Sequence, residues 1–346
     1  MRRNISVSLV LAVALCLGGC GGTAPDRPSE SASDSLSAEE STSQMPSTLT
    51  SQDDNVIPTS SYSASDQKKQ DDFVPYQAPE FADSAFHEEH AVGNERAKVD
   101  IEHVSLGYVA VSAQSDCRLK FQVVKDGEKY NYDIASDGTP SILPLQSGDG
   151  VYSFKVMENI RETEYLPLYT TECQVTLEDE FQPFLRPNDY SNYSEDSDCV
   201  KKGRELAGTA ETALEYVGAV FDYVCHNIVY DQEKAAAVQS KSLTVYLPDP
   251  DETLETGKGI CFDYASLVAA MLRSQGIPTK LVFGYVSPDN IYHAWNMFYT
   301  EETGWVTVSY EVRPGEWNRL DLTFSANGAD GTFIGDGSNY ADVYYY

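Results

Sequence analysis

Residues 256–276 run TGKGICFDYASLVAAMLRSQG and place Cys261 between a glycine-rich bend and a helical pattern. Apolar side chains recur after the cysteine at helical spacing, and Gly276 is a typical helix end. A cysteine at a helix N-terminus faces unpaired backbone N–H groups and the positive end of the helix dipole, which lower the thiol pKa and can stabilise an oxyanion. The stretch therefore predicts a nucleophilic cysteine, with a small buried thiol as the alternative.

A histidine follows this helix on a predicted β-hairpin. Lys280–Val286 and Tyr292–Tyr299 have the pattern of strands, and Ser287–Asn290 has the composition of a turn. Alternation along the second strand places His293 on one face with Trp295, Met297 and Tyr299, so the imidazole should lie on an apolar wall. A thiolate needs a base of near-neutral pKa, and His293 is the candidate because one helix and one hairpin can bring it to the cysteine.

A third group is expected to hold the imidazole tautomer and to stabilise its charged form. Asp321 lies in the stretch WNRLDLTF, residues 317–324, on a predicted neighbouring strand. A carboxylate there can accept the Nδ1 proton of His293. We prefer Asp321, with Glu311 or no third member as the alternatives.

Three motifs together resemble the transglutaminase-like, papain-related domains of bacterial surface proteins: GICFDYA at 259–265, YHAWN at 292–296 and LDLTF at 320–324. The earlier Tyr230-Asp231 also fits, and the resemblance covers about residue 185 to the end of the chain. It implies a papain-like helix-plus-sheet core in which Cys261 is the nucleophile, His293 the general base and Asp321 its orienting group. It also implies that no metal or other cofactor is needed.

The resemblance implies an enzyme that forms a thioester from a protein or peptide amide and passes the acyl group to water or to an amine. Phe262 stands where the animal crosslinking enzymes typically carry tryptophan, and Leu322 stands where relatives usually carry proline. We favour hydrolysis, as a peptidase or amidase, over crosslinking. The alternative is a non-catalytic surface module that keeps the fold for binding.

Short alternating runs between about residues 97 and 177 predict β-strands. Turn sequences separate several of these runs, as at Lys125–Glu128 and Ser136–Gly138. Helical periodicity follows an acidic stretch at 193–198. We therefore expect an α+β protein in which a small all-β, sandwich-like domain at 87–184 precedes the transglutaminase-like core at 185–346. The expected strands are Tyr108–Val111, Leu119–Val124, Tyr130–Ile134, Tyr152–Val156 and Cys173–Leu177.

The first 86 residues predict export and attachment. Residues 1–20 combine a basic start, a short apolar core and Leu17-Gly18-Gly19-Cys20, which looks like a bacterial lipobox. That resemblance implies a lipid on Cys20 and a protein anchored at the extracytoplasmic face of the cell membrane. Residues 21–86 are rich in Ser, Thr and Asp, which predicts a disordered stalk.

Charge and cysteine content limit the partners and the redox state. The net charge of −30 argues against nucleic acid as a partner, because phosphate binding needs a clustered basic surface. A protein or peptide substrate at the cell surface is what the family resemblance implies. Five cysteines remain after the lipobox, an odd number. Pairing of Cys117 with Cys173 and of Cys199 with Cys225 would leave Cys261 alone, and free thiols throughout are the alternative.

The motif His87-Glu88-Glu89-His90 superficially suggests a zinc-binding helix. The zinc metalloprotease pattern needs two residues between the glutamate and the second histidine, and this chain has one. We therefore expect no metal site from this motif.

Overall fold

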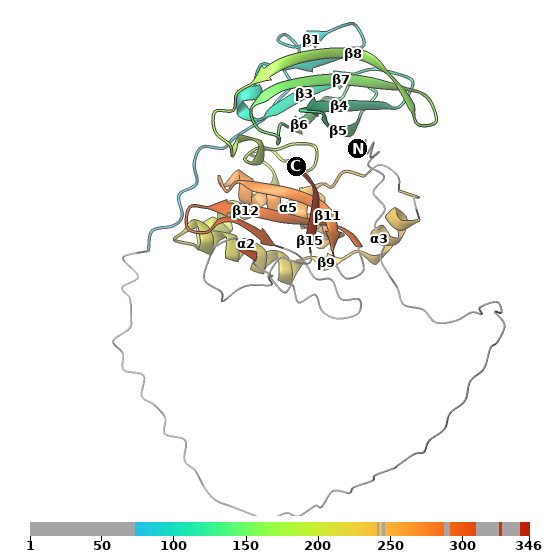
Figure 1. Ribbon diagram of the computed structural model, residues 1–346. Coiled ribbons are helices and arrows are strands. Elements are labelled where there is room, and N and C mark those ends of the chain that lie inside the picture. Colours follow the sequence, from blue (N-terminus) through green and yellow to red (C-terminus); the bar gives the residue numbers. More distant parts are fainter. Residues whose placement is uncertain (1–72, 241, 244–245, 287–290, 309–324, 327–339) are drawn as a thin grey trace, which may run out of the picture. The chain divides into compact units, whose positions relative to one another are not determined.

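The computed structural model describes residues 73–240, 242–243, 246–286, 291–308, 325–326 and 340–346, and its residues from Val74 onward belong to one compact unit (Figure 1). Cys20, Glu311 and Asp321 lie outside the described residues, as does most of the predicted stalk. Among the described residues, no helix is long and apolar enough to cross a membrane.

Two antiparallel four-stranded sheets form the first part of the unit (Figure 1). The first, in the order β1-β2-β3-β6, contains Val92–Gly93, Ala97–Asp100, Tyr108–Ala113 and Ser141–Pro144. The second, in the order β5-β4-β7-β8, contains Glu128–Ile134, Leu119–Lys125, Gly150–Arg161 and Glu164–Val175. Val99 and Val111 from one sheet share a core with Phe121 and Phe154 from the other, which confirms the sandwich-like prediction.

The strands differ in extent from the sequence prediction. β1, β2 and β6 were not predicted, and the strand expected at Cys173–Leu177 begins at Glu164 and ends at Val175. β7 and β8 each contain 12 residues, but their pairing shifts register between Val156 and Met157. Such a bulge interrupts the alternation on which strand prediction depends.

Five α-helices and a five-stranded antiparallel sheet follow within the described residues (Figure 1). The helices are α1 (Asp198–Ala207), α2 (Ala213–Asn227), α3 (Gln232–Gln239), α4 (Pro250–Thr256) and α5 (Cys261–Ser274). The sheet has the order β14-β13-β12-β11-β15. Its strands are β11 (Thr279–Val286), β12 (Ile291–Thr300), β13 (Gly304–Val308), β14 (Ser325–Ala326) and β15 (Tyr340–Tyr345).

Helix α5 is buried along its whole length, between the sheet and the other helices. On one side the Asn296 side chain in β12 donates a hydrogen bond to the Ala265 carbonyl at 2.9 Å. On another side the Tyr216 hydroxyl in α2 donates to the Met271 carbonyl at 2.6 Å. The cysteine-bearing helix therefore packs on an antiparallel sheet, and the predicted α+β, papain-like class is confirmed.

The sandwich and the helical part share aromatic contacts. Tyr132 of β5 packs edge-to-face against Tyr190 at 5.9 Å and against Tyr346 at 5.8 Å between ring centroids. Tyr190 in turn lies 5.9 Å from Phe262, the residue after Cys261. The packing of the sandwich is therefore continuous with the packing around the start of α5. The domain boundary at 184/185 stays a prediction.

Candidate active site

The bend before Cys261 is fixed by two glycines. Gly257 ends α4 at φ +62°, a left-handed conformation that glycine adopts at little cost. At Gly259 an added Cβ would lie 2.5 Å from the Asp263 Cβ, so a larger residue would displace the start of α5. These glycines place Cys261 at the first position of the helix.

A short parallel pairing anchors the same bend. β9 (Val229–Tyr230) pairs with β10 (Lys258–Gly259), and the Asp231 N–H donates to the Gly259 carbonyl at 2.9 Å. The Tyr230 side chain lies near the Cys261 thiol. Burial is the largest cause that raises the pKa of Tyr230 above its usual range, and the charge of the Cys261 thiolate is the second. The Tyr230-Asp231 motif thus contributes to the surroundings of the cysteine.

Cys261 is 4% exposed and is surrounded by backbone donors. The N–H groups of Ala294, Phe262 and Cys261 itself stabilise its thiolate, but burial outweighs them and raises the thiol pKa to about 11. The backbone N–H groups at the helix N-terminus lower this pKa, as expected, but the loss of solvation raises it by more, so the net shift is upward. Backbone N–H groups beside a nucleophile can also stabilise the oxyanion of a tetrahedral intermediate.

His293 lies on β12 directly before Ala294, whose N–H contacts the Cys261 thiol. It pairs with Gly284 of β11, is half-buried, and its Nε2 atom is shielded from solvent. The residues that share its strand face are Trp295, which is fully buried, and Met297 and Tyr299, which are partly buried. The structure thus brings the cysteine to the strand position next to the predicted base, while the catalytic roles stay predictions.

A buried polar network behind Cys261 was not predicted. The Asp263 carboxylate, fully buried in the first turn of α5, accepts a hydrogen bond from the Ile260 N–H at 2.7 Å. It also accepts from the Tyr246 hydroxyl and lies 3.3 Å from the Lys234 ammonium, which itself donates to the Tyr246 hydroxyl at 2.9 Å. Burial raises the pKa of Asp263, and the Ile260 N–H and Lys234 oppose that shift. The network fixes the residue before the cysteine.

A capping signal could have identified one member of this network. Asp263 is the third residue of α5, the position from which an acidic side chain reaches back to the N-terminal backbone. Lys234 and Tyr246 come from segments 29 and 17 residues away, and no local pattern indicates that they meet.

All five cysteines in the described part of the chain are free thiols, so the alternative with two bridges is wrong and the alternative with free thiols holds. Cys199 is fully buried at the start of α1, and Cys117 is exposed. Cys261 is therefore one thiol among several, and its surroundings, rather than its lack of a bridge partner, distinguish it.

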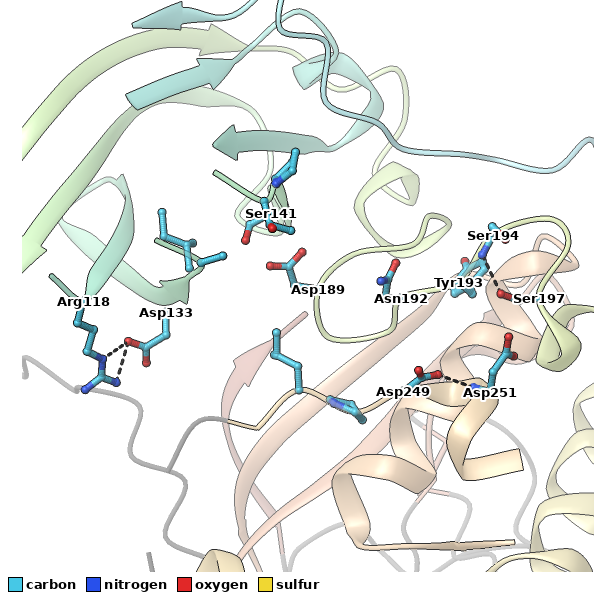
Figure 2. Close-up of a pocket in the computed structure, with 16 residues that line it drawn as sticks. Arg118, Asp133, Ser141, Asp189, Asn192, Tyr193, Ser194, Ser197, Asp249 and Asp251 are labelled. Atoms are coloured by element: carbon cyan, nitrogen blue, oxygen red, sulfur yellow. Dashed lines mark hydrogen bonds and ion pairs between the residues drawn. The ribbon is translucent and has the colours of Figure 1, made fainter. Parts of the chain in front are cut away.

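A cavity of about 760 Å³ lies elsewhere, and Figure 2 shows its acidic lining. Its carboxylates are engaged within the protein: Asp133 pairs with Arg118, Asp249 caps α4, and Asp251 accepts from the Cys199 N–H. Burial raises the pKa of Asp189 there to about 6. Neither Cys261 nor His293 lines this cavity, so the candidate site remains the start of α5.

Comparison with known proteins agrees with this geometry. Residues 201–310 match the family described as the transglutaminase-like superfamily. Kyphoscoliosis peptidase of Homo sapiens is 31% identical over 136 residues, which cover 36% of this chain and 18% of that protein. Protein-glutamine gamma-glutamyltransferase of Pseudomonas aeruginosa is 31% identical over 107 residues, which cover 27% of this chain and 15% of that protein.

The matched part thus spans less than a fifth of either relative. The solved structure of a TGase aligns with a TM-score of 0.27 at 20% identity, covering 44% of this chain and 42% of that one. The matched family segment contains both Cys261 and His293 and ends before Asp321. The chain carries a transglutaminase-like superfamily domain in residues 201–310.

Proposed function

We propose that this protein is a cysteine-dependent enzyme that cleaves protein or peptide amide bonds through a thioester on Cys261, with water as the preferred acceptor. The main support is that three backbone N–H groups face the buried Cys261 thiol, and one of them belongs to Ala294, the residue next to His293. The names of two relatives, a peptidase and a protein-glutamine gamma-glutamyltransferase, both describe reactions at amide bonds.

In the proposed reaction, His293 takes the Cys261 proton as the sulfur attacks the amide carbonyl carbon. The N–H groups of Phe262 and Ala294 face the thiol and can stabilise the oxyanion. The C–N bond then breaks, and the leaving amine takes the proton from His293. Water, deprotonated by His293, attacks the thioester; the C–S bond breaks, the acid is released, and the proton returns to the sulfur.

Asp321 is the proposed third member. Its carboxylate would accept the Nδ1 proton of His293, and Asp321→Ala should lower turnover by less than loss of the histidine does. Glu311→Ala is the matched control. If Glu311→Ala removes turnover and Asp321→Ala does not, the choice of third residue is wrong and the cysteine–histidine mechanism stands.

One assay tests the reaction and its acceptor. The protein is incubated with a glutamine-containing peptide mixture, with and without a primary amine, and new peptide N-termini, released ammonia and incorporated amine are measured. New N-termini or amine-independent ammonia, absent in Cys261→Ala, are expected. If amine incorporation is the main product, the preferred acceptor is an amine and the reaction is crosslinking rather than hydrolysis. Absence of all three products and of thiol acylation would favour a binding module.

We also propose that the enzyme acts at the extracytoplasmic face of the membrane, held by a lipid on Cys20. The support is the lipobox sequence. Cys20→Ser should move the protein from the membrane fraction to the soluble fraction. Unchanged membrane retention would contradict lipid anchoring.

A further inference from the structure

Three histidines and two acidic residues gather beside the first sheet of the sandwich. His87 and His90 precede β1, whereas Asp100, Glu102 and His103 lie at the end of β2 and in the turn that follows it. Ligand atoms of His87, Glu102 and His103 all lie within 4.8 Å of one another. Glu102 and His103 thus provide possible ligands that the spacing of the His87–His90 motif alone does not provide.

Glu102 lies at the centre of the group. Its Oε2 atom contacts the Nδ1 atom of His90 and lies 3.8 Å from the Nε2 atom of His103. The His87 and His103 rings are 5.0 Å apart between centroids, edge to face, and the His87 and His90 rings are 6.0 Å apart. One carboxylate therefore has three imidazoles around it, a ligand set of nitrogen and oxygen atoms that suits zinc and similar divalent ions.

A buried carboxylate lies beside His87. The Asp100 side chain is 1% exposed, and its Oδ2 atom lies 3.3 Å from the His87 Nδ1 atom. Asp100 is itself held by the His87 N–H at 2.8 Å and the Glu102 N–H at 3.0 Å. Metal-binding histidines commonly present their other ring nitrogen to such a carboxylate. Within the described residues the His87 Nδ1 atom is shielded from solvent and forms no hydrogen bond, so Asp100 lies beside the ring and either ring nitrogen of His87 can take the ligand role.

The group needs only a small contraction to coordinate an ion. Zinc–nitrogen bonds of about 2.0–2.1 Å in a tetrahedron place neighbouring ligand atoms roughly 3.3–3.4 Å apart. The ligand atoms of His87, Glu102 and His103 lie within 4.8 Å of one another, so they must move closer by up to about 1.5 Å, and His90 would join them from outside that group. The side chains of His90 and Glu102 are 47% and 40% exposed, so their rotation meets little resistance from packing.

We propose that His87, Glu102 and His103, with His90 as fourth ligand, bind one zinc-like divalent transition-metal ion. The ion links the segment before β1 to the turn after β2. It therefore fastens the start of the folded unit, where the predicted stalk joins it, to the sandwich. The site does not involve Cys261 or His293, so the metal-site proposal can be tested separately from the proposed enzyme activity.

Titration of the metal-free full chain with Co²⁺, followed by displacement with Zn²⁺, tests the proposal. We expect one ion per chain, a visible cobalt spectrum without thiolate charge-transfer bands, and a Tm that rises with Zn²⁺. His87→Ala and His103→Ala should each weaken binding by about tenfold or more and lose the Tm increase. His226→Ala, on the exposed side of α2, is the matched control and should bind as the wild type does.

Glu102→Gln tests the same site with a smaller change in shape, and the Tm of each metal-free variant reports its folding. The proposal is overturned if the wild type binds neither ion or if His103→Ala binds as tightly as the wild type. It is also overturned if thiolate bands place the ion on cysteines.

Discussion

Helices α1 and α5 each carry a buried cysteine in the first turn, and the two thiols differ in what faces them. Cys199 is the second residue of α1 and 0% exposed, whereas Cys261 is the first residue of α5 and 4% exposed. Both positions are close to the positive end of a helix dipole. Burial is the largest cause of a raised pKa at both thiols.

The neighbours of the two thiols have opposite effects. At Cys199 the Asp251 carboxylate adds to burial and holds the thiol pKa far above its usual range. At Cys261 the strongest opposing contribution is the Ala294 N–H of β12, and the pKa is raised only to about 11. A helix N-terminus therefore does not by itself make a nucleophile; the group that faces the thiol decides.

The largest expected effect separates the two cysteines directly. Cys261→Ala should lower amide cleavage by roughly 10³-fold or more, because it removes the attacking atom. Cys199→Ala, the matched change at the other helix, should leave kcat within about twofold and cost only stability. Steady-state rates of both variants check this. Loss of activity in Cys199→Ala alone would reverse the assignment.

His293→Ala should lower turnover nearly as far, because it removes the base that serves the same step. The double variant Cys261→Ala/His293→Ala should be scarcely slower than Cys261→Ala alone. Turnover rates of the two single variants and of the double variant test this expectation. Additive losses would mean that the two residues act in separate steps.

A smaller effect is expected from the network behind Cys261. Asp263→Asn keeps the shape but weakens the contacts to Lys234 and Tyr246, and should cost about 1–3 kcal/mol of unfolding free energy. We expect kcat to fall about tenfold with KM little changed, since the start of α5 would shift. Asp222→Asn, on the exposed side of α2, is the control. A stability loss with unchanged kcat would limit Asp263 to a structural role.

The smallest effect concerns pH. Because the Cys261 pKa is raised to about 11, its alkylation rate should increase about tenfold per pH unit through pH 9–10 without a plateau. The protonated thiol is favoured in the folded state, so its contribution to stability is present below about pH 9 and is lost towards pH 11. Mass spectrometry of alkylated peptides measures each cysteine separately. A plateau for Cys261 near pH 7 would contradict the raised pKa.

The same experiment tests the other thiol. Asp251→Asn removes the charge beside Cys199 and should increase its alkylation several-fold while leaving Cys261 unchanged. An equal change at both cysteines would show that α1 has been disrupted generally.

Local sequence was sufficient for the elements around the candidate site. The glycine bend, the helix from Cys261 and the hairpin that carries His293 follow from turn chemistry and periodicity. The structure contains the bend, the helix and the two paired strands of the hairpin, and the predicted turn at 287–290 lies outside the described residues. The Asp126-Gly127 turn was also predictable, because the Asp-Gly pair favours a two-residue hairpin loop. In the structure both residues have the positive φ that such a loop requires, 53° and 86°.

Contacts between distant segments were not predictable in this way. The Ser141–Pro144 strand is short and contains a proline, so its sequence is not typical of a strand. The bulges in the pairing of β7 with β8 interrupt the alternation, so the full length of these strands could not be predicted. The pairing of Asp263 with Lys234, and of His87 with His103, depends on how separate elements meet. The sign of the Cys261 pKa shift likewise depends on burial, which the helix position alone does not reveal.

The most direct test is to trap the acyl-enzyme. The wild-type protein is mixed with an amide substrate, quenched with acid within one turnover, digested and analysed by mass spectrometry. The proposed mechanism predicts an acyl group on the peptide that contains Cys261 and none on the peptide that contains Cys199. An acyl group on another residue, or turnover with no acylated cysteine, would contradict it.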